Sequence, residues 1–200
     1  MEKINTRQLL LEVSERVFAE SGFEGASTRR ITVEAGVNIA TIKYYYGSKE
    51  LLYAAIFNYR IAELNTALAS RLKNNTAGTV KKLNTFIDEY AKLLKVNIYF
   101  LRLLHRELCS FNKSSLKTSI ITDLTKNSKM LYKLIEQGIA GKVFRKVNLP
   151  MAVLTVFSLL FQIVAGTPIA ESMLQYEKFD IDWQERVEDL KGFILSILKV

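Results

Sequence analysis

The chain has 200 residues, of which 49% are hydrophobic and 24% are charged, a composition typical of a folded globular protein and not of a disordered one. Its formal net charge is +8, yet the first fifty residues hold seven acidic and seven basic side chains, so net charge alone does not indicate nucleic-acid binding. A single cysteine excludes an internal disulfide and favours a reducing compartment, and we expect a cytoplasmic protein.

Helical patterns begin close to the amino terminus, and the chain contains only two prolines and nine glycines to interrupt them. We expect a first helix from Thr6 to Ser21, where apolar residues recur at helical spacing. A second helix is predicted from a Ser27 cap to Ala35, and a third from an Asn38 cap to Tyr45. Gly36 supplies the turn between the second and third helices.

The sequence pattern predicts helices in the rest of the chain as well. Ser48 caps a predicted fourth helix that reaches Lys73, and the sequence NNTAG at 74–78 predicts a loop. Alternation of apolar and polar residues over a useful strand length is absent from the sequence, so the expected fold is all-α. Further helices are predicted over Thr79–Val96, Ile98–Ser110, Ser114–Gln137, Pro150–Ala165 and Asp182–Lys199.

Two short helices joined by a glycine turn form the geometry that places a helix in the major groove of DNA. In the third helix Val37 and Ile42 are expected to face inward, while polar, aromatic and basic side chains face outward. Such groups hydrogen-bond bases and phosphates, and small apolar side chains contact thymine methyls. The alternative is that the tyrosines are core aromatics, favoured for Tyr46, and that the arginines form a solvated face. The candidate DNA-binding residues are Ser27, Arg29, Asn38, Ile39, Ala40, Thr41, Lys43, Tyr44, Tyr45 and Lys49.

The stretch FAESGFEGASTRRITVEAGVNIATIKYYYGSKELL, from Phe18 to Leu52, resembles the amino-terminal domain of the TetR family of bacterial transcription regulators. The resemblance covers about Arg7 to Phe57. It implies that Arg29, Thr41, Tyr45 and Lys49 contact phosphates and that the start of the third helix reads bases. The matching positions are Phe18, Gly22, Phe23, Ser27, Ile31, Ala35, Gly36, Val37, Thr41, Tyr45, Lys49 and Leu51.

Five positions depart from the family pattern. Asn38 replaces the usual Ser or Thr cap and is chemically equivalent to it. The other departures concern the base-reading face and the core, and they bear on the operator sequence and not on the binding mode. They are Ile39, Ala40, Lys43 and Tyr46.

One reading helix contacts only a few base pairs, so useful affinity requires two of them, and we expect a homodimer on double-stranded operator DNA. The apolar helices at 150–165 and 182–199 are the candidate interface, and the family resemblance places a dimerising four-helix bundle at the last two helices. The alternative, an ordinary intrachain core, is compatible with this role. The predicted interface residues are Leu154, Phe157, Leu160, Phe161, Val164, Trp183, Leu190, Phe193, Ile194 and Ile197.

The middle helices carry aromatic and polar residues that can line a cavity for an unknown small-molecule effector. Each is individually better explained as core. With one histidine and one cysteine we expect no metal site, no cofactor and no catalytic residue, and a helical enzyme is therefore disfavoured. The candidate effector residues are Phe86, Tyr90, Tyr99, Phe100, Leu103, Leu104, His105, Glu107, Phe111 and Tyr132.

The sequence leaves two alternatives open. The uncharged, apolar segment at 148–170 approaches the length of a membrane span, although its polar residues and prolines favour a buried helix without membrane contact. The basic residues between Lys113 and Lys146 are either a solvated face or a site for an anionic effector or an extra phosphate contact.

The sequence therefore predicts a helix-turn-helix domain over residues 1–47 and an effector-binding and dimerisation domain over 48–200. The expected function is ligand-responsive transcriptional regulation. The family resemblance implies repression that a small-molecule effector relieves. The rival is a membrane-associated helical protein anchored by residues 148–170.

Overall fold

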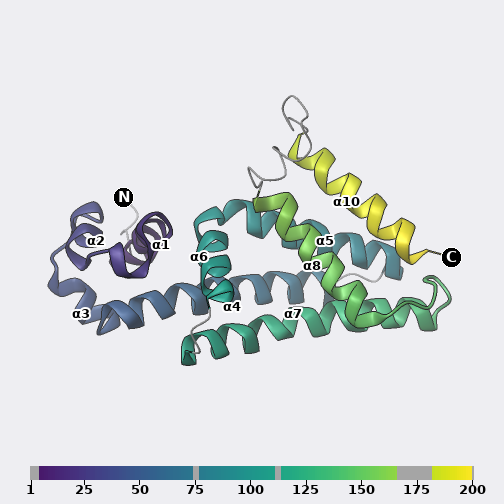
Figure 1. Cartoon of the computed structure of the whole chain (residues 1–200), viewed down its shortest axis with the longest axis horizontal. Helices are drawn as coiled ribbons and strands as arrows, with labels where there is room; N and C mark the ends of the chain where they lie inside the picture. Colours follow the sequence, from purple (N-terminus) through teal and green to yellow (C-terminus); the bar gives the residue numbers. More distant parts are fainter. Residues whose placement is uncertain (1–4, 74–76, 111–113, 166–181, 200) are drawn as a thin grey trace. The chain divides into compact units, whose positions relative to one another are not determined.

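The computed structural model describes residues 5–73, 77–110, 114–165 and 182–199, without the side chains of residues 73, 164 and 165 (Figure 1). Within these ranges the chain is helical apart from its turns and one isolated bridge between Phe144 and Lys199, so the all-α prediction is confirmed. The helices are α1 (Thr6–Gly25), α2 (Thr28–Glu34), α3 (Ala40–Tyr46), α4 (Lys49–Lys73), α5 (Thr79–Val96), α6 (Ile98–Cys109), α7 (Ser115–Ala140), α8 (Leu149–Ala165) and α10 (Trp183–Leu198).

The helices divide into two compact units. Unit 1 comprises Met1–Glu63 and Asn97–Asp123, and so contains α1, α2, α3, most of α4, α6 and the start of α7. Unit 2 comprises Leu64–Val96 and Leu124–Val200, and so contains the end of α4, α5, most of α7, α8 and α10. Helices α4 and α7 each contribute residues to both units.

Unit 1 is built on a chain of aromatic contacts. Phe18 of α1 packs against Tyr53 of α4 with ring centroids 5.0 Å apart, and Tyr53 packs against Phe57 at 5.1 Å. Phe57 in turn contacts Phe100 of α6 at 5.9 Å. Each edge-to-face pair adds a directional term to the burial of its rings, so the core fixes α1, α4 and α6 together.

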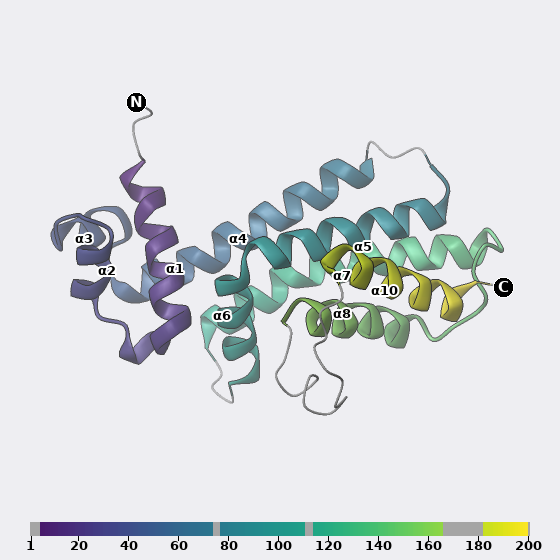
Figure 2. The same cartoon turned by 90° about the horizontal axis from the view of Figure 1, so that it is seen from above.

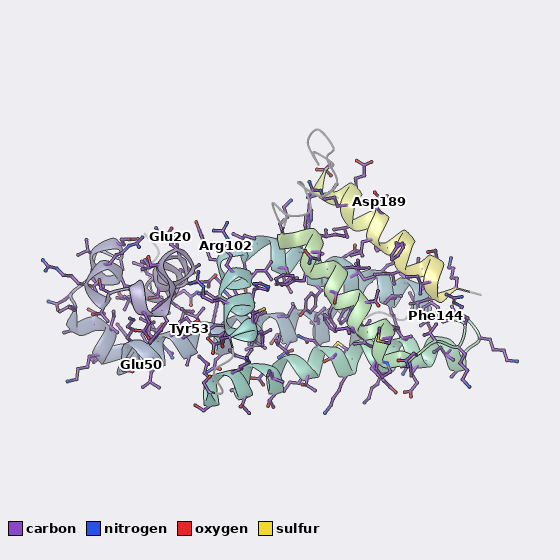
Figure 3. All side chains as sticks on the ribbon, in the orientation of Figure 1. Glu20, Glu50, Tyr53, Arg102, Phe144 and Asp189 are labelled. Atoms are coloured by element: carbon purple, nitrogen blue, oxygen red, sulfur yellow. The ribbon has the colours of Figure 1, made fainter. Side chains whose placement is uncertain are left out.

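Unit 2 has its own core. Helix α5 is amphipathic and buries a row that includes Leu83, Phe86 and Tyr90, and α8 and α10 both pack against it (Figures 1 and 2). After α7 the chain turns back, and Phe144 lies beside the end of α10 (Figure 3). A Cβ at Gly138 would lie 2.0 Å from the Phe144 ring, so glycine is needed there to admit the phenyl group.

Candidate DNA-binding site

The turn between α2 and α3 is closed by backbone hydrogen bonds alone. The Val37 N–H donates to the Thr32 carbonyl at 3.0 Å, and the Gly36 N–H donates to the Val33 carbonyl at 3.1 Å. This pair of bonds is the Schellman motif, which requires a left-handed residue, and Gly36 supplies it with a φ of +65°. The predicted glycine turn is confirmed.

Side-chain hydrogen bonds mark the start of both helices of this motif. The Ser27 hydroxyl accepts from the Arg30 N–H at 3.0 Å, and the Asn38 Oδ1 accepts from the Ala40 N–H at 2.8 Å. The predicted Ser27 cap is confirmed, whereas the cap residue of α3 is Ile39 and not Asn38, because α3 begins at Ala40. Asn38 bonds the first turn of α3 from one residue before the cap.

A four-charge network holds α2 against α1. Arg30 bonds Glu34 at 2.7 Å within α2 and reaches Glu20 of α1, while Arg16 of α1 bonds Glu34 at 2.7 Å. Hydrogen bonds and charge from Glu34 and Glu20 raise the pKa of Arg30, and the same contact with Arg30 lowers the pKa of Glu34. Arg30 is thus a structural residue, whereas Arg29 is exposed and makes no ion pair within the described ranges.

Helix α3 buries one face and exposes the other. Ile42 is buried, whereas Tyr44 is 81% exposed and Ile39 is 56% exposed. Lys43 and Tyr45 are also exposed, and the rings of Tyr44 and Tyr45 meet edge to face at 4.8 Å. An apolar residue and tyrosines held out in water form a surface that needs a partner.

Tyr46 belongs to the buried side, as predicted. Its hydroxyl donates to the carbonyl of Arg7 at 2.6 Å, and the Arg7 guanidinium lies over its ring at 5.7 Å. Burial raises the pKa of this phenol. The polar atom that distinguishes Tyr46 from a phenylalanine is therefore used to fasten α3 to the start of α1.

The remaining predicted DNA contacts lie at the rim of this surface. Thr41 is half-buried, and Ala40 is exposed at the start of α3. The ammonium group of Lys49, at the start of α4, lies 4.5 Å from the centre of the Phe23 ring, a cation–π geometry. The predicted phosphate contact of Lys49 stays a prediction.

These geometries agree with comparison to known proteins. A sequence model described as bacterial regulatory proteins, tetR family, matches residues 10–56. The amino-terminal domain belongs to the TetR family of bacterial regulatory proteins. The match begins within α1 and ends within α4, and it includes all of α2 and α3.

Individual relatives and solved structures match different lengths of the chain. The chain is 26% identical, over 98% of its length and 96% of the relative, to the probable HTH-type transcriptional regulator YttP of Bacillus subtilis (strain 168). It is 42% identical, over 26% of its length and 28% of the relative, to the HTH-type transcriptional repressor AcnR of Corynebacterium efficiens. A solved structure of AibR in complex with isovaleryl coenzyme A and operator DNA shares the fold, with a TM-score of 0.77 at 18% identity over 94% of this chain and 97% of that one. The predicted family and regulator class are confirmed.

Helices α1, α4 and α6 meet at a buried ion pair. Glu15 of α1, 3% exposed, accepts from the Arg60 guanidinium of α4 at 2.7 Å, and Arg60 also bonds Glu63 at 3.0 Å. Burial raises the pKa of Glu15, although Arg60 and a hydrogen bond from the Phe100 N–H oppose the rise. The carboxylate therefore joins three helices of unit 1.

A residue of α6 that we did not predict also holds α1. The Arg106 guanidinium donates to the carbonyls of Phe18 and Ala19 at 3.2 and 3.4 Å, just before α1 leaves helical geometry at Gly22. Free carbonyls at a helix end favour a cation. The sequence shows that Arg106 is basic, but it does not indicate that this side chain reaches Phe18, which lies 88 residues away.

The predicted effector residues do not form one group. Phe100, Leu103 and Leu104 are buried in unit 1 with Glu107 half-buried and His105 exposed, whereas Phe86 and Tyr90 are buried in unit 2. Tyr99 is half-buried in unit 1, Tyr132 is 36% exposed in unit 2, and Phe111 lies outside the described residues. The effector assignment stays a prediction for all of these residues.

The predicted dimer residues fall into two groups. Leu160, Leu190 and Ile194 are buried in the core of unit 2, so the intrachain alternative holds for them. Leu154 and Phe193 are more than half exposed. Phe157, Phe161, Trp183 and Ile197 are half-buried, and the Val164 side chain lies outside the described residues.

An apolar pocket of about 160 Å³ opens between α8 and α10, lined in part by Met151, Ile194 and Ile197.

No helix in the described part of the chain is both long and apolar enough to cross a membrane. Likewise, no group of three or more His, Cys, Asp or Glu side chains able to hold a metal ion occurs in those ranges.

Proposed function

We propose that the protein is a transcriptional repressor that binds operator DNA as a homodimer and is released by a small-molecule effector. The single observation that carries the proposal is the outward face of α3, where Ile39, Lys43, Tyr44 and Tyr45 stand exposed on a helix whose other face is anchored by Ile42. The domain division at residue 47 and the roles of individual residues are part of this proposal.

Base reading falls to the start and centre of α3. The Lys43 ammonium can donate to guanine acceptors, and Ile39 and Ala40 can contact thymine methyls. Arg29, Thr41, Tyr45 and Lys49 suit phosphate contacts, which fix the register of the helix without reading sequence. Because Arg30 is occupied by two carboxylates, we assign it no DNA contact.

Dimerisation is supported by unit 2. Met151 and Leu154 of α8 and Phe193 of α10 are each more than half exposed, and Met151 also lines the apolar pocket between these helices. Apolar side chains grouped on adjacent helices favour burial against a second copy. Two reading helices then face two half-sites.

The effector response is supported by analogy. The AibR structure contains both an acyl-coenzyme A and operator DNA on a chain of this fold. A ligand that prefers one arrangement of the dimer shifts it away from the spacing that DNA requires. The proposed sign, repression, follows the repressor AcnR, to which the reading domain is similar.

The proposal is tested by selecting duplexes from a random pool with the purified full chain, and then measuring affinity against salt concentration. We expect a palindromic or pseudo-palindromic motif, bound by two chains. Tyr45→Phe and Lys49→Ala should weaken every duplex alike, and Lys49→Ala should reduce the salt slope by about one phosphate per chain. The matched control is Lys92→Ala, which removes an exposed charge from α5.

Two results would count against the proposal. One is a wild-type protein that enriches no motif and binds no duplex at low salt. The other is a Lys92→Ala variant that loses as much affinity as Lys49→Ala, since the charge effect would then be general and not local to the reading face.

A further inference from the structure

Buried polar atoms without partners are concentrated in unit 2. Within the described ranges, four buried side-chain atoms lack a hydrogen-bond partner: Oδ1 of Asn65, Oδ1 of Asn84, and both Oδ1 and Nδ2 of Asn127. All three asparagines belong to unit 2. The buried polar groups of unit 1, among them Glu15, Ser14 and Thr32, are bonded.

Asn127 is the most unusual of the three. It lies on α7 with no exposed surface; its side chain approaches the Tyr90 phenol, but neither its Oδ1 nor its Nδ2 makes a hydrogen bond of good geometry. Native proteins rarely bury such a group, because losing its hydrogen bonds to water is costly unless something replaces them. A leucine would fill a similar volume without this cost, so the amide points to a partner from outside the chain.

The surroundings of Asn127 define what that partner must be. Its side chain lies beside the buried phenol of Tyr90: burial raises the pKa of this phenol, and the interaction with Asn127 lowers it in part. Tyr90 stacks on Phe86 with centroids 5.7 Å apart, and Phe157 of α8 meets Tyr90 edge to face at 5.2 Å. Two neutral polar groups are therefore backed by aromatic rings.

We propose that unit 2 binds a ligand whose uncharged polar group pairs with Asn127 and Tyr90 and whose apolar part lies against Phe86 and Phe157. This inference rests on the proposed effector response and specifies the chemistry of the effector. An amide and a phenol can donate to a carbonyl and accept from a hydroxyl or amide, but neither neutralises a carboxylate, which would lose its hydration on entry.

Three probes of one shape test this chemistry: phenylacetamide, phenylacetate and ethylbenzene. Phenylacetamide should raise the thermal midpoint of the full chain in a concentration-dependent way. Its dissociation constant should be at least about tenfold lower than those of the other two, because only the amide satisfies both polar side chains without carrying charge. Equal responses to all three, or none to any, would overturn the proposed ligand class.

Asn127→Leu separates a ligand-binding role from a structural one. Without ligand this variant should keep its midpoint or gain about 2–4 °C, because it removes two unpaired polar atoms. It should lose the preference for phenylacetamide over ethylbenzene, whereas Asn58→Leu, an exposed change on α4, should retain it. A fall of several degrees with the preference intact would show that the amide serves the fold alone.

The same samples are assayed on the selected duplex. Wild-type protein that binds the duplex but shows no preference for the amide refutes this inference and leaves the proposed function standing. Wild-type protein that binds no duplex refutes the proposed function itself.

Discussion

Replacing Arg60 by methionine removes the cation that, among the described residues, directly bonds the buried carboxylate of Glu15. Glu15 is 3% exposed, and its other partner is the Phe100 N–H. Removing one member of a buried ion pair costs about 3–5 kcal/mol, because the remaining charge is left without compensation. We therefore expect Arg60→Met to lower the free energy of unfolding by that amount near neutral pH.

The cost should depend on pH. Burial already raises the folded-state pKa of Glu15, and without the Arg60 guanidinium the pKa rises further. A carboxyl whose pKa is higher in the folded state contributes fully below its unfolded pKa, and the contribution is lost as pH rises through the folded value. The variant should thus recover stability toward acid, from its folded pKa down to about 4.5, by at most about 1.4 kcal/mol per pH unit.

Urea unfolding followed by circular dichroism between pH 4.5 and 8 measures both effects. The matched control is Arg71→Met, since Arg71 is 64% exposed and its contact with Glu89 is 3.5 Å long. An exposed pair of this kind is worth about 0–1 kcal/mol. Equal costs for the two variants, or a cost for Arg60→Met that stays constant over the whole pH range, would refute this account of the buried pair.

Four further changes probe the reading domain and the interface. Tyr46→Phe removes the hydroxyl bond to Arg7 and should cost about 1 kcal/mol in urea unfolding without altering the selected DNA motif. Gly36→Ala should lower the free energy of unfolding by about 1–2 kcal/mol, because φ at this position is +65°, although no atom lies within 4 Å of the added methyl. An unchanged free energy of unfolding would show that this backbone conformation imposes no strain on alanine. Lys43→Ala should relax base preference at one position, and recovery of an unchanged motif would remove Lys43 from readout. Phe193→Glu should give monomers in sedimentation, whereas an intact dimer would place the interface elsewhere.

The reading domain was largely predictable because its signals are local. Ser27, Gly36 and Asn38 act on backbone groups within five residues of themselves, so a cap or a turn can be recognised from its own short stretch of sequence. Once Ile42 is assigned to the buried face of α3, the helical repeat indicates which residues lie on the exposed face. These predictions required no knowledge of how distant segments meet.

The contacts that hold the domain together could not be predicted in this way. Arg106 reaches Phe18 across 88 residues, and Tyr46 reaches Arg7 across 39. Helical spacing marked α6 as amphipathic but did not indicate which core it joins. For that reason the predicted effector set combined Phe100, which packs in unit 1, with Tyr90, which packs in unit 2.

The predicted effector set did not include Asn127, which we propose as a ligand contact from its burial. A polar residue on a long helix is usually exposed to solvent, and α7 carries several polar residues. Only burial distinguishes Asn127 from Asn and Ser residues that face water, and burial depends on how the other helices of unit 2 cover it.

The network of Arg16, Glu20, Arg30 and Glu34 has a consequence for how the regulator searches a genome. By binding one another, these four side chains leave Arg29, Lys43 and Lys49 as the cations that residues 27–49 can offer to DNA, Lys43 to bases and the other two to phosphates. Three per chain, six per dimer, release few counterions, so attachment to random sequence should be loose and short-lived at cellular ionic strength. Such a protein would sample sites by frequent detachment, and would linger only where base contacts add to the electrostatic attraction.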